Sequence, residues 1–248
     1  MALWNPWHGC HKYSVGCMNC YVYRIDKKHG KDSTIVTKNK TFNMPIERNK
    51  KGEYKVKPGT IIYTCFSSDF FVSDADIWRK EAWEMIKERS DCTFFFLTKR
   101  IDRFYDVIPS DWGNGYPNVF IVCTVENQKE ADYRLPIFIN APIKRKAIAC
   151  APLLSDIDLE KYLSEDILEV AADGESGLDA RVCDYKWMVH LREQCERKKV
   201  KFTFRQTGTK FLKDGKVYTV PRKEHFKQAR KANLNYDPNK TKTLFSTD

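Results

Sequence analysis

The sequence predicts an α/β fold in which parallel strands alternate with helices, arranged as a full or partial (β/α) barrel of the TIM type. Six short runs are apolar almost throughout, as strands buried on both faces require, and amphipathic segments lie between them. Polar clusters follow nearly every run, and barrels build their sites from the loops at the C-terminal ends of strands. A doubly wound nucleotide-binding fold would instead place a glycine-rich turn after the first strand, and the chain has none. The predicted strands cover residues 60–66, 93–97, 119–125, 146–150, 167–172 and 201–205, and a short strand at 2–4 precedes them.

Two of the predicted helices have recognisable N-terminal caps. Ser73 can cap a helix with Asp76 three positions later, and the apolar residues that follow recur on one face of that helix. Asp184 can cap a second helix whose apolar residues again recur at helical spacing. Both helices should therefore pack against the sheet.

Length and composition indicate one globular domain. With 248 residues the chain can bury one substantial core, and its 31% charged and 42% hydrophobic residues are typical of soluble proteins. We predict a barrel domain over residues 1–220 with an N-terminal cluster loop, followed by a basic tail over residues 221–248. No apolar run is long enough for a membrane span, and no signal-peptide pattern is present. Nine cysteines is an odd number for a disulfide framework, so we expect a cytoplasmic protein with reduced thiols.

The basic charge of the chain is compatible with an anionic partner. The formal net charge is +10 and the sequence pI is about 9.1. Much of the excess lies in a predicted hairpin over residues 48–57 and in the segment 222–242. Such segments are most often solvated surface. Nucleic acid remains a possible partner, although the chain has no helix-turn-helix, finger or RNA-binding signature.

Three cysteines, Cys10, Cys17 and Cys20, lie on one glycine-punctuated loop after the first predicted strand. Three thiolates can hold three irons of a 4Fe–4S cluster, and because ordinary clusters take four cysteines, the fourth iron would stay open. S-adenosylmethionine would bind at that open iron. The alternative is a structural zinc site made by the same cysteines with His8 or His11. The other six cysteines lie in or beside apolar segments and are expected to be small core residues.

The sequence resembles a phage-named family of proteins that carry a three-cysteine motif and are related to the radical S-adenosylmethionine enzymes. The resemblance runs in the same order from Leu3 to Gly208 and leaves the C-terminal segment uncovered. The matching stretches are Trp4-Asn5-Pro6, Gly16-Cys17-Met18-Asn19-Cys20-Tyr21, Ser68-Asp69-Phe70-Phe71, Leu97-Thr98-Lys99-Arg100, Val125-Glu126-Asn127-Gln128, Pro152-Leu153-Leu154 and Gly174-Glu175-Ser176-Gly177.

Three features depart from the pattern of related enzymes. Six residues, rather than three, separate the first two cysteines. Ala151 stands where family members have glutamate before a proline, and Asp173 stands where they have glycine. An acid near the site has therefore changed position, as is expected when the substrate changes while the fold persists.

The resemblance implies a lyase that uses a 4Fe–4S cluster and S-adenosylmethionine. The reduced cluster, supplied with one electron by a donor such as flavodoxin or ferredoxin, breaks the carbon–sulfur bond of the cofactor, and the resulting 5′-deoxyadenosyl radical abstracts a hydrogen from the substrate. The best-matching activity is that of queuine lyase, which cleaves the free base queuine to 7-aminomethyl-7-deazaguanine in queuosine salvage. Two alternatives stay open: a radical enzyme that repairs nucleic acid, as photoproduct lyases do, and a zinc-stabilised nucleic-acid-binding module.

The resemblance also suggests which residues bind the cofactor. Residues after the predicted second strand would accept from the methionine ammonium, a lysine would hold the carboxylate, residues after a later strand would hold the ribose, and a tyrosine would lie against the adenine. In that order they are Ser67, Ser68 and Asp69; Lys99; Thr124 and Glu126; and Tyr21. Asp69 could instead be a helix cap, and Lys99 with Arg100 could be a surface pair.

For the substrate, one carboxylate could accept from both donors on the edge of a 7-deazaguanine base. Asp173, Glu175 and Asp26 are the candidates, and Glu175 is the best placed because glycines flank its turn. Trp7, Phe70 or Phe71 could stack on the ring, although aromatic residues of this kind are more often part of the core.

Overall fold

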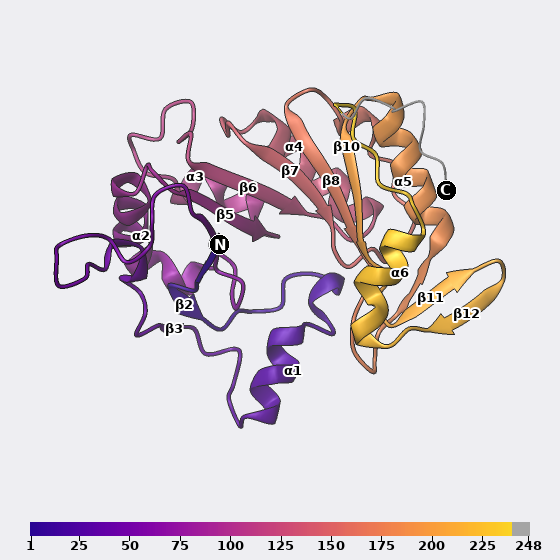
Figure 1. Ribbon diagram of the computed structural model, residues 1–248, viewed down its shortest axis with the longest axis horizontal. Helices are drawn as coiled ribbons and strands as arrows, with labels where there is room; N and C mark the ends of the chain where they lie inside the picture. The colour runs from indigo at the N-terminus through magenta and orange to yellow at the C-terminus, as the bar shows by residue number, and fades with distance from the viewer. Residues whose placement is uncertain (240–248) are drawn as a thin grey trace.

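The protein is described here by a computed structural model that covers residues 1–239, and a seven-stranded sheet forms its centre (Figure 1). Every neighbouring pair of strands is parallel, and the spatial order follows the order along the chain. The parallel α/β prediction is confirmed, with strand bounds that differ from the predicted ones by at most two residues. The strands are β1 (Ala2–Trp4), β4 (Ile61–Thr64), β5 (Thr93–Thr98), β6 (Val119–Thr124), β7 (Lys146–Cys150), β8 (Ile167–Asp173) and β10 (Lys201–Gln206).

The sheet is open. β1 and β10 form its two edges, and within residues 1–239 no backbone ladder joins them. The outer side of β10 is instead bridged at Phe202 by Tyr236, a residue beyond the last strand. Among the described residues, the strands therefore do not close into a barrel.

Helices connect most of the consecutive strands. Figure 1 shows α2 (Asp76–Glu88) and α5 (Tyr185–Arg197) toward opposite ends of the sheet and α4 (Gln128–Asn140) behind its middle. The short α3 (Phe104–Val107) precedes β6, and only a single 3-10 turn, η5 (Glu160–Tyr162), lies between β7 and β8. The buried faces of these helices join one hydrophobic core with the sheet.

One of the two predicted caps is present. The side chain of Asp184 accepts a hydrogen bond from the Lys186 amide at 2.9 Å and caps α5, as predicted. The prediction for Ser73 is wrong, because residues Ser73–Ala75 form a 3-10 turn, η3, and α2 begins at Asp76. The Asp76 carboxylate pairs with Arg79 and with Arg103, and it is therefore not available to close a capping box with Ser73.

Part of the predicted basic tail packs on the domain. β9 (Val182–Asp184), β11 (Lys210–Lys213) and β12 (Lys216–Thr219) form a small second sheet, and η6 (Arg222–Glu224) and α6 (His225–Lys231) follow it. His225 and Ala229 are buried, and α6 packs along β10. Residues 221–239 thus extend the domain beyond the predicted boundary at 220. The remaining part of the predicted tail, residues 240–248, lies outside the described residues.

The N-terminal segment forms a separate small unit beside the sheet. β2 (Trp7–His8) pairs with β3 (Thr37–Lys38), and η1 (Val15–Cys17) and α1 (Tyr21–Lys28) lie between them in the chain. After η2 (Met44–Ile46), a bridge between Arg48 and Tyr54 marks the predicted hairpin. No helix among the described residues is long and apolar enough to cross a membrane.

Candidate functional site

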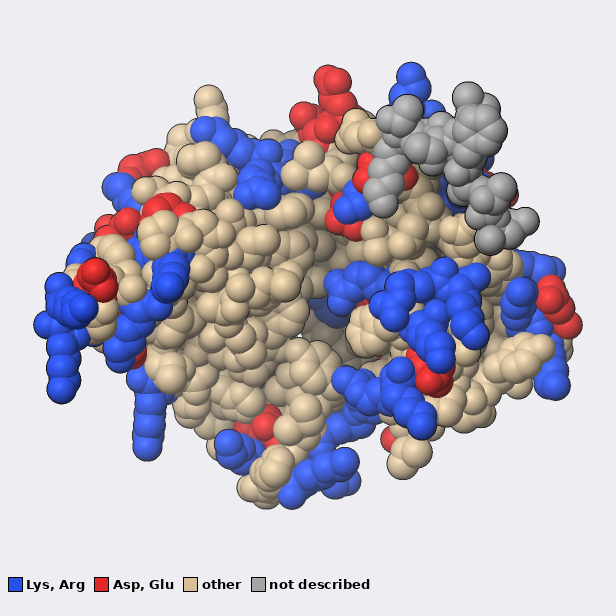
Figure 2. Space-filling model, in the orientation of Figure 1, with Lys and Arg blue, Asp and Glu red and all other residues tan. Residues whose placement is uncertain are grey.

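A cavity of about 360 Å³ opens at the C-terminal ends of the central strands. Its wall is built from the cysteine loop after β1 and from the residues that end or follow β4, β5, β6, β7, β8 and β10. Figure 2 shows a hollow in the molecular surface in this region, bordered on one side by lysine and arginine side chains. Because parallel strands bring all their carboxyl ends to one edge, polar residues far apart in the sequence meet here. The volume suits a small-molecule ligand.

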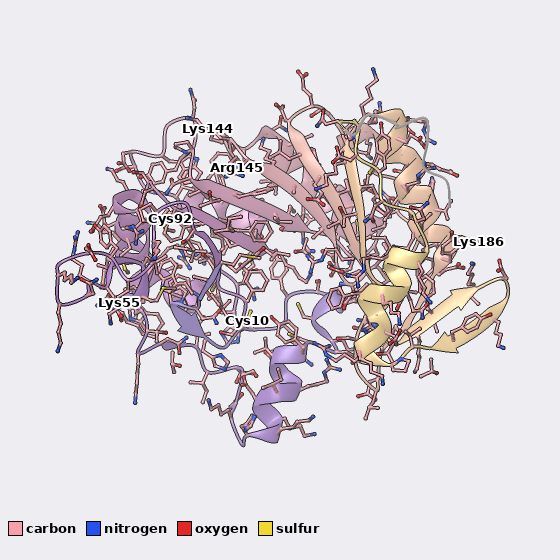
Figure 3. All side chains as sticks on the ribbon, in the orientation of Figure 1. Cys10, Lys55, Cys92, Lys144, Arg145 and Lys186 are labelled. Carbon is pink, nitrogen blue, oxygen red and sulfur yellow. The ribbon has the colours of Figure 1, made fainter. Side chains whose placement is uncertain are left out.

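Cys10, Cys17 and Cys20 all line this cavity, as the sequence predicts for three ligands of one centre. Cys17 ends η1, Cys20 is the N-cap of α1, and Figure 3 shows Cys10 between the β2–β3 pair and the central sheet. The guanidinium of Arg100 lies 3.6 Å from Cys10 Sγ. Backbone N–H groups at the start of α1, those of Val22 and Tyr23, favour the thiolate of Cys20 and oppose the effect of burial, which raises its pKa.

The donor set suits a cationic centre held by thiolates. Burial, with a smaller contribution from Asp69, raises the pKa of Cys10 to about 12, so this thiol ionises readily only beside a cation. Within residues 1–239, no three side chains of Cys, His, Asp or Glu already converge on one ion. The three sulfurs share a wall of the cavity and would have to draw together around a bound centre.

Neither histidine of the zinc alternative reaches the cysteines. The Nε2 atom of His8 lies 2.9 Å from Asp26 Oδ2, and that of His11 lies 2.8 Å from Asp74 Oδ1. Asp26 also accepts from Ser33, is buried and does not line the cavity. The predicted contact of Asp26 with substrate is therefore not supported, because its carboxylate binds His8 and Ser33 within the N-terminal unit.

Glu175 anchors the cysteine loop. It lines the cavity at the end of β8, yet its Oε2 atom accepts from Asn19 Nδ2 at 3.0 Å and from the Arg181 amide and Nε at 2.9 Å. Arg181 in turn donates to the Val15 carbonyl at 2.9 Å. Burial opposes ionisation, but these hydrogen bonds outweigh it and lower the pKa of Glu175. The carboxylate predicted as the best substrate contact is therefore already occupied by partners in the protein.

Glu126 is a second anchor for the same loop. It is fully buried and is absent from the cavity wall. Its Oε1 atom accepts from the Gly16 amide at 3.1 Å and from Ser14 Oγ, and Arg134 Nη1 donates to Oε2 at 2.8 Å. A Cβ atom at Gly16 would lie 2.9 Å from the Glu126 carboxyl group, so the close approach requires glycine. The predicted contact of Glu126 with a ribose is not present.

Asp69 borders the cavity but holds its own loop. Its Oδ1 atom accepts from the Phe71 amide at 2.9 Å and from Thr98 Oγ1 at 2.8 Å, while Oδ2 accepts from the Lys99 amide at 2.9 Å. Arg100 Nη1 lies 3.5 Å from Oδ2. Asp69 therefore closes a turn and ties it to the end of β5, which is closer to the capping alternative than to a free acceptor for an ammonium group.

The other predicted cofactor residues divide into two groups. Ser68, Lys99, Thr124 and Tyr21 line the cavity, whereas Ser67 does not. Lys99 is largely buried, with Nζ donating to the Ala151 carbonyl at 3.1 Å and lying 3.8 Å from Glu126 Oε2, so it is not a surface residue. Of the seven predicted residues that line the cavity besides the cysteines, Asp69, Asp173 and Glu175 are the acids.

 An acceptor atom without a hydrogen-bond partner is found at Asp173, the last residue of β8. Asp173 is only 5% exposed and lines the cavity, and the unpartnered atom is Oδ1. The nearest cation, Arg205 Nε, lies 3.4 Å away without hydrogen-bond geometry. Burial raises the pKa of Asp173 to about 6, and Arg205 opposes that rise. Asp173 is therefore the carboxylate in the cavity wall that keeps an oxygen without a hydrogen-bond partner.

Besides the cysteines, seven predicted residues line the cavity. They are Tyr21, Ser68, Asp69, Lys99, Thr124, Asp173 and Glu175.

The predicted stacking residues belong to the core. Trp7, Phe70 and Phe71 are fully buried and do not line the cavity. Phe70 stacks on Phe96 with ring centroids 4.6 Å apart, and Trp7 Nε1 donates to the Asp69 carbonyl at 3.2 Å. Their predicted contact with substrate is wrong, because the apolar side of the loop after β4 faces the sheet.

Sequence reasoning missed several residues of the cavity wall. Their signal was position, since each lies on the cysteine loop or at the end of a predicted strand. They are Asn19, Cys65, Phe66, Arg100, Arg205 and Gln206. The other buried cysteines, Cys92, Cys123, Cys150, Cys183 and Cys195, are core residues, as predicted.

Comparison with known proteins identifies the family of the chain. No curated protein and no solved structure matches it. One family model matches residues 1–237, a range that includes the cysteine loop and every residue of the cavity wall. The chain therefore belongs to the family described as "Protein of unknown function (DUF5131)".

Proposed function

We propose that the protein is a radical S-adenosylmethionine enzyme whose 4Fe–4S cluster is held by Cys10, Cys17 and Cys20. The observation that carries the proposal is that the three thiols of one loop line a cavity at the C-terminal ends of parallel strands. Among the described residues, no histidine lines that cavity, and its one further thiol, that of Cys65, is buried after β4. A set of three loop thiolates leaves one iron for a small molecule, whereas the zinc alternative lacks its histidine ligand because His8 and His11 bind carboxylates elsewhere. The open sheet, with strands in chain order, is consistent with a partial (β/α) barrel.

When bound, the cluster would supply one electron, taken from a donor such as flavodoxin or ferredoxin, to break the carbon–sulfur bond of S-adenosylmethionine. The residues of the chain would bind and orient the ligands. Arg100 beside Cys10 favours thiolates, and the largely buried Lys99 provides a cation for the carboxylate of the cofactor. Tyr21, beside Cys20 in the cavity wall, would lie against the adenine.

The substrate class that we propose is a modified nucleobase, with queuine as the best candidate and 7-aminomethyl-7-deazaguanine as the product. Asp173 supports this choice, because an unpartnered carboxylate oxygen can accept from the N–H and amino donors on one edge of such a base. It replaces Glu175 in the role, since Glu175 is occupied by Arg181 and Asn19. The proposed enzyme is a cytoplasmic lyase.

Anaerobic purification tests the proposal directly. The protein should be brown, contain about four irons per chain and lose them on replacement of any one of the three cysteines. It should also form 5′-deoxyadenosine from S-adenosylmethionine after reduction. Colourless protein with one zinc per chain would contradict the proposal.

A further inference from the structure

The C-terminal part of the domain carries a concentration of positive charge that the proposed reaction does not use. The segment 205–231 has nine lysines and arginines and only two acidic residues, although the whole chain has a net charge of +10. We call these nine residues the basic ridge. They are Arg205, Lys210, Lys213, Lys216, Arg222, Lys223, Lys227, Arg230 and Lys231. A free base such as queuine has no phosphate that could neutralise them.

The charge of the ridge is mostly unpaired. Within residues 1–239, its only ion pairs are Arg205 with Asp173 at 3.4 Å and Lys227 with Glu224 at 3.6 Å. Elsewhere on the surface, cations with nearby carboxylates are common, as for Lys55 with Glu47 at 3.0 Å. Unpaired cations gathered on one surface attract a polyanion.

The ridge begins at the wall of the cavity. Arg205 both belongs to it and lines the cavity, and the neighbouring Gln206 lines the cavity too. The amide of the next residue, Thr207, donates to the carbonyl of His225, the first residue of α6, at 3.4 Å. Figure 2 shows the lysine and arginine side chains over the region of α6 beside the hollow. A ligand on the ridge would therefore lie next to the mouth of the cavity.

Exposed aromatic side chains lie among these cations. Phe226 is 51% exposed on α6, while His225 and Ala229 face the domain. Arg230 is four residues after Phe226 and lies on the same flank of the helix. Tyr218 of β12 is 45% exposed, with Lys216 Nζ 5.2 Å from its ring centroid. Proteins that bind single-stranded nucleic acid combine cations along the phosphate backbone with aromatic rings on which the bases stack.

We propose that the basic ridge binds single-stranded nucleic acid and holds it beside the mouth of the cavity. This goes beyond the proposed reaction on a free base. It does not depend on the identity of the centre at the cysteines, because every residue that carries it lies in segment 205–231. Bases stacked inside a duplex are not accessible to Phe226, so the surface should prefer single strands.

Fluorescence anisotropy with a labelled oligonucleotide of about 12 nucleotides tests the proposal on the full chain, without S-adenosylmethionine. Affinity should fall steeply between low and moderate salt, and a duplex of the same sequence should bind more weakly. The double variant R222E/K227E should lose about tenfold or more in affinity and should show a shallower salt dependence. F226A should lose about tenfold with the salt dependence unchanged, because stacking is not an ionic contact.

A matched control separates the ridge from net charge. The variant K50E/K51E makes the same change of charge in the segment 48–57, which lies at the far end of the molecule near Lys55 in Figure 3, and its affinity should stay within about twofold of the parent. The proposal would be overturned by any of three results. These are an equal loss of affinity in both double variants, unchanged affinity of F226A, or equally tight binding of the protein to vesicles of anionic lipid. Failure here leaves the iron content and cofactor cleavage untouched, and a protein without iron can still pass this test.

Discussion

Glu175 Oε2 accepts a hydrogen bond from Asn19 Nδ2 at 3.0 Å, which ties the end of β8 to the peptide between Cys17 and Cys20. Arg181 binds both Glu175 and the Val15 carbonyl, and together these contacts hold the cysteine loop at the C-terminal edge of the sheet. The loop follows β2, a strand of only two residues, so its position depends on side-chain contacts with distant strand ends.

Glu175→Gln should therefore loosen the cysteine loop. The amide keeps the shape of the side chain but replaces one acceptor oxygen by a donor that faces Arg181, and losing a charged hydrogen bond costs about 1.5–3 kcal/mol. We expect a lower free energy of unfolding in urea and a lower iron content. Glu160→Gln removes an exposed partner of Arg197 and should change neither by much. An unchanged iron content in Glu175→Gln would show that the contact does not position the loop.

The three cysteines should be individually necessary for the proposed cluster. Cys10→Ala, Cys17→Ala and Cys20→Ala should each lose iron and all cleavage of S-adenosylmethionine, because two thiolates anchor a cluster poorly. Cys195→Ala provides the control, since that residue is buried in the core away from the cavity. Iron per chain and 5′-deoxyadenosine formation are the measurements. A full cluster in Cys10→Ala would contradict the ligand assignment.

Asp173 should make the stability of the protein depend on pH. Its folded pKa of about 6 lies above its unfolded value, so the folded state binds more protons and stability is lost as the pH rises from about 4 to above 6. The loss should be on the order of 2–3 kcal/mol. Asp173→Asn should lack this contribution, and urea unfolding at a series of pH values measures the difference. Parallel curves for the two proteins would show that Asp173 titrates normally.

Asp173 should also determine the binding of the base. With reduced enzyme, 5′-deoxyadenosine should form in step with the loss of queuine, and the product should be 7-aminomethyl-7-deazaguanine by mass. Asp173→Asn should raise the concentration of base needed about tenfold or more, because an amide presents a donor where the base presents donors. Cofactor cleavage without substrate should persist. If Asp173→Asn uses queuine as well as the parent, the proposed base contact is absent.

The strands of the sheet could be predicted from the sequence, but whether the sheet closes into a barrel could not. Runs such as residues 146–150 are apolar on both faces, and this pattern is local. Whether β1 meets β10 depends on long-range pairing, and Tyr236, which bridges β10 instead, gives no such signal in the sequence. For the site, strand-end positions indicated Asp173 and Glu175, and both residues line the cavity. Which of them is free depends on partners far away in the chain, here Asn19 and Arg181.

Because the sheet is open, a seam without backbone pairing runs along the protein between the edge strands β1 and β10 of the described residues. In a closed barrel the number of strands limits the width of the interior. Here, the contacts that span the seam on the described residues include those of Arg24 with the Ser176 carbonyl at 2.7 Å and of Arg181 with the Val15 carbonyl at 2.9 Å. We therefore expect the breadth of ligand that the cavity admits to depend on the length of this one loop and on the contacts that hold it, and insertions in the loop should admit larger ligands while leaving the strand ladders intact.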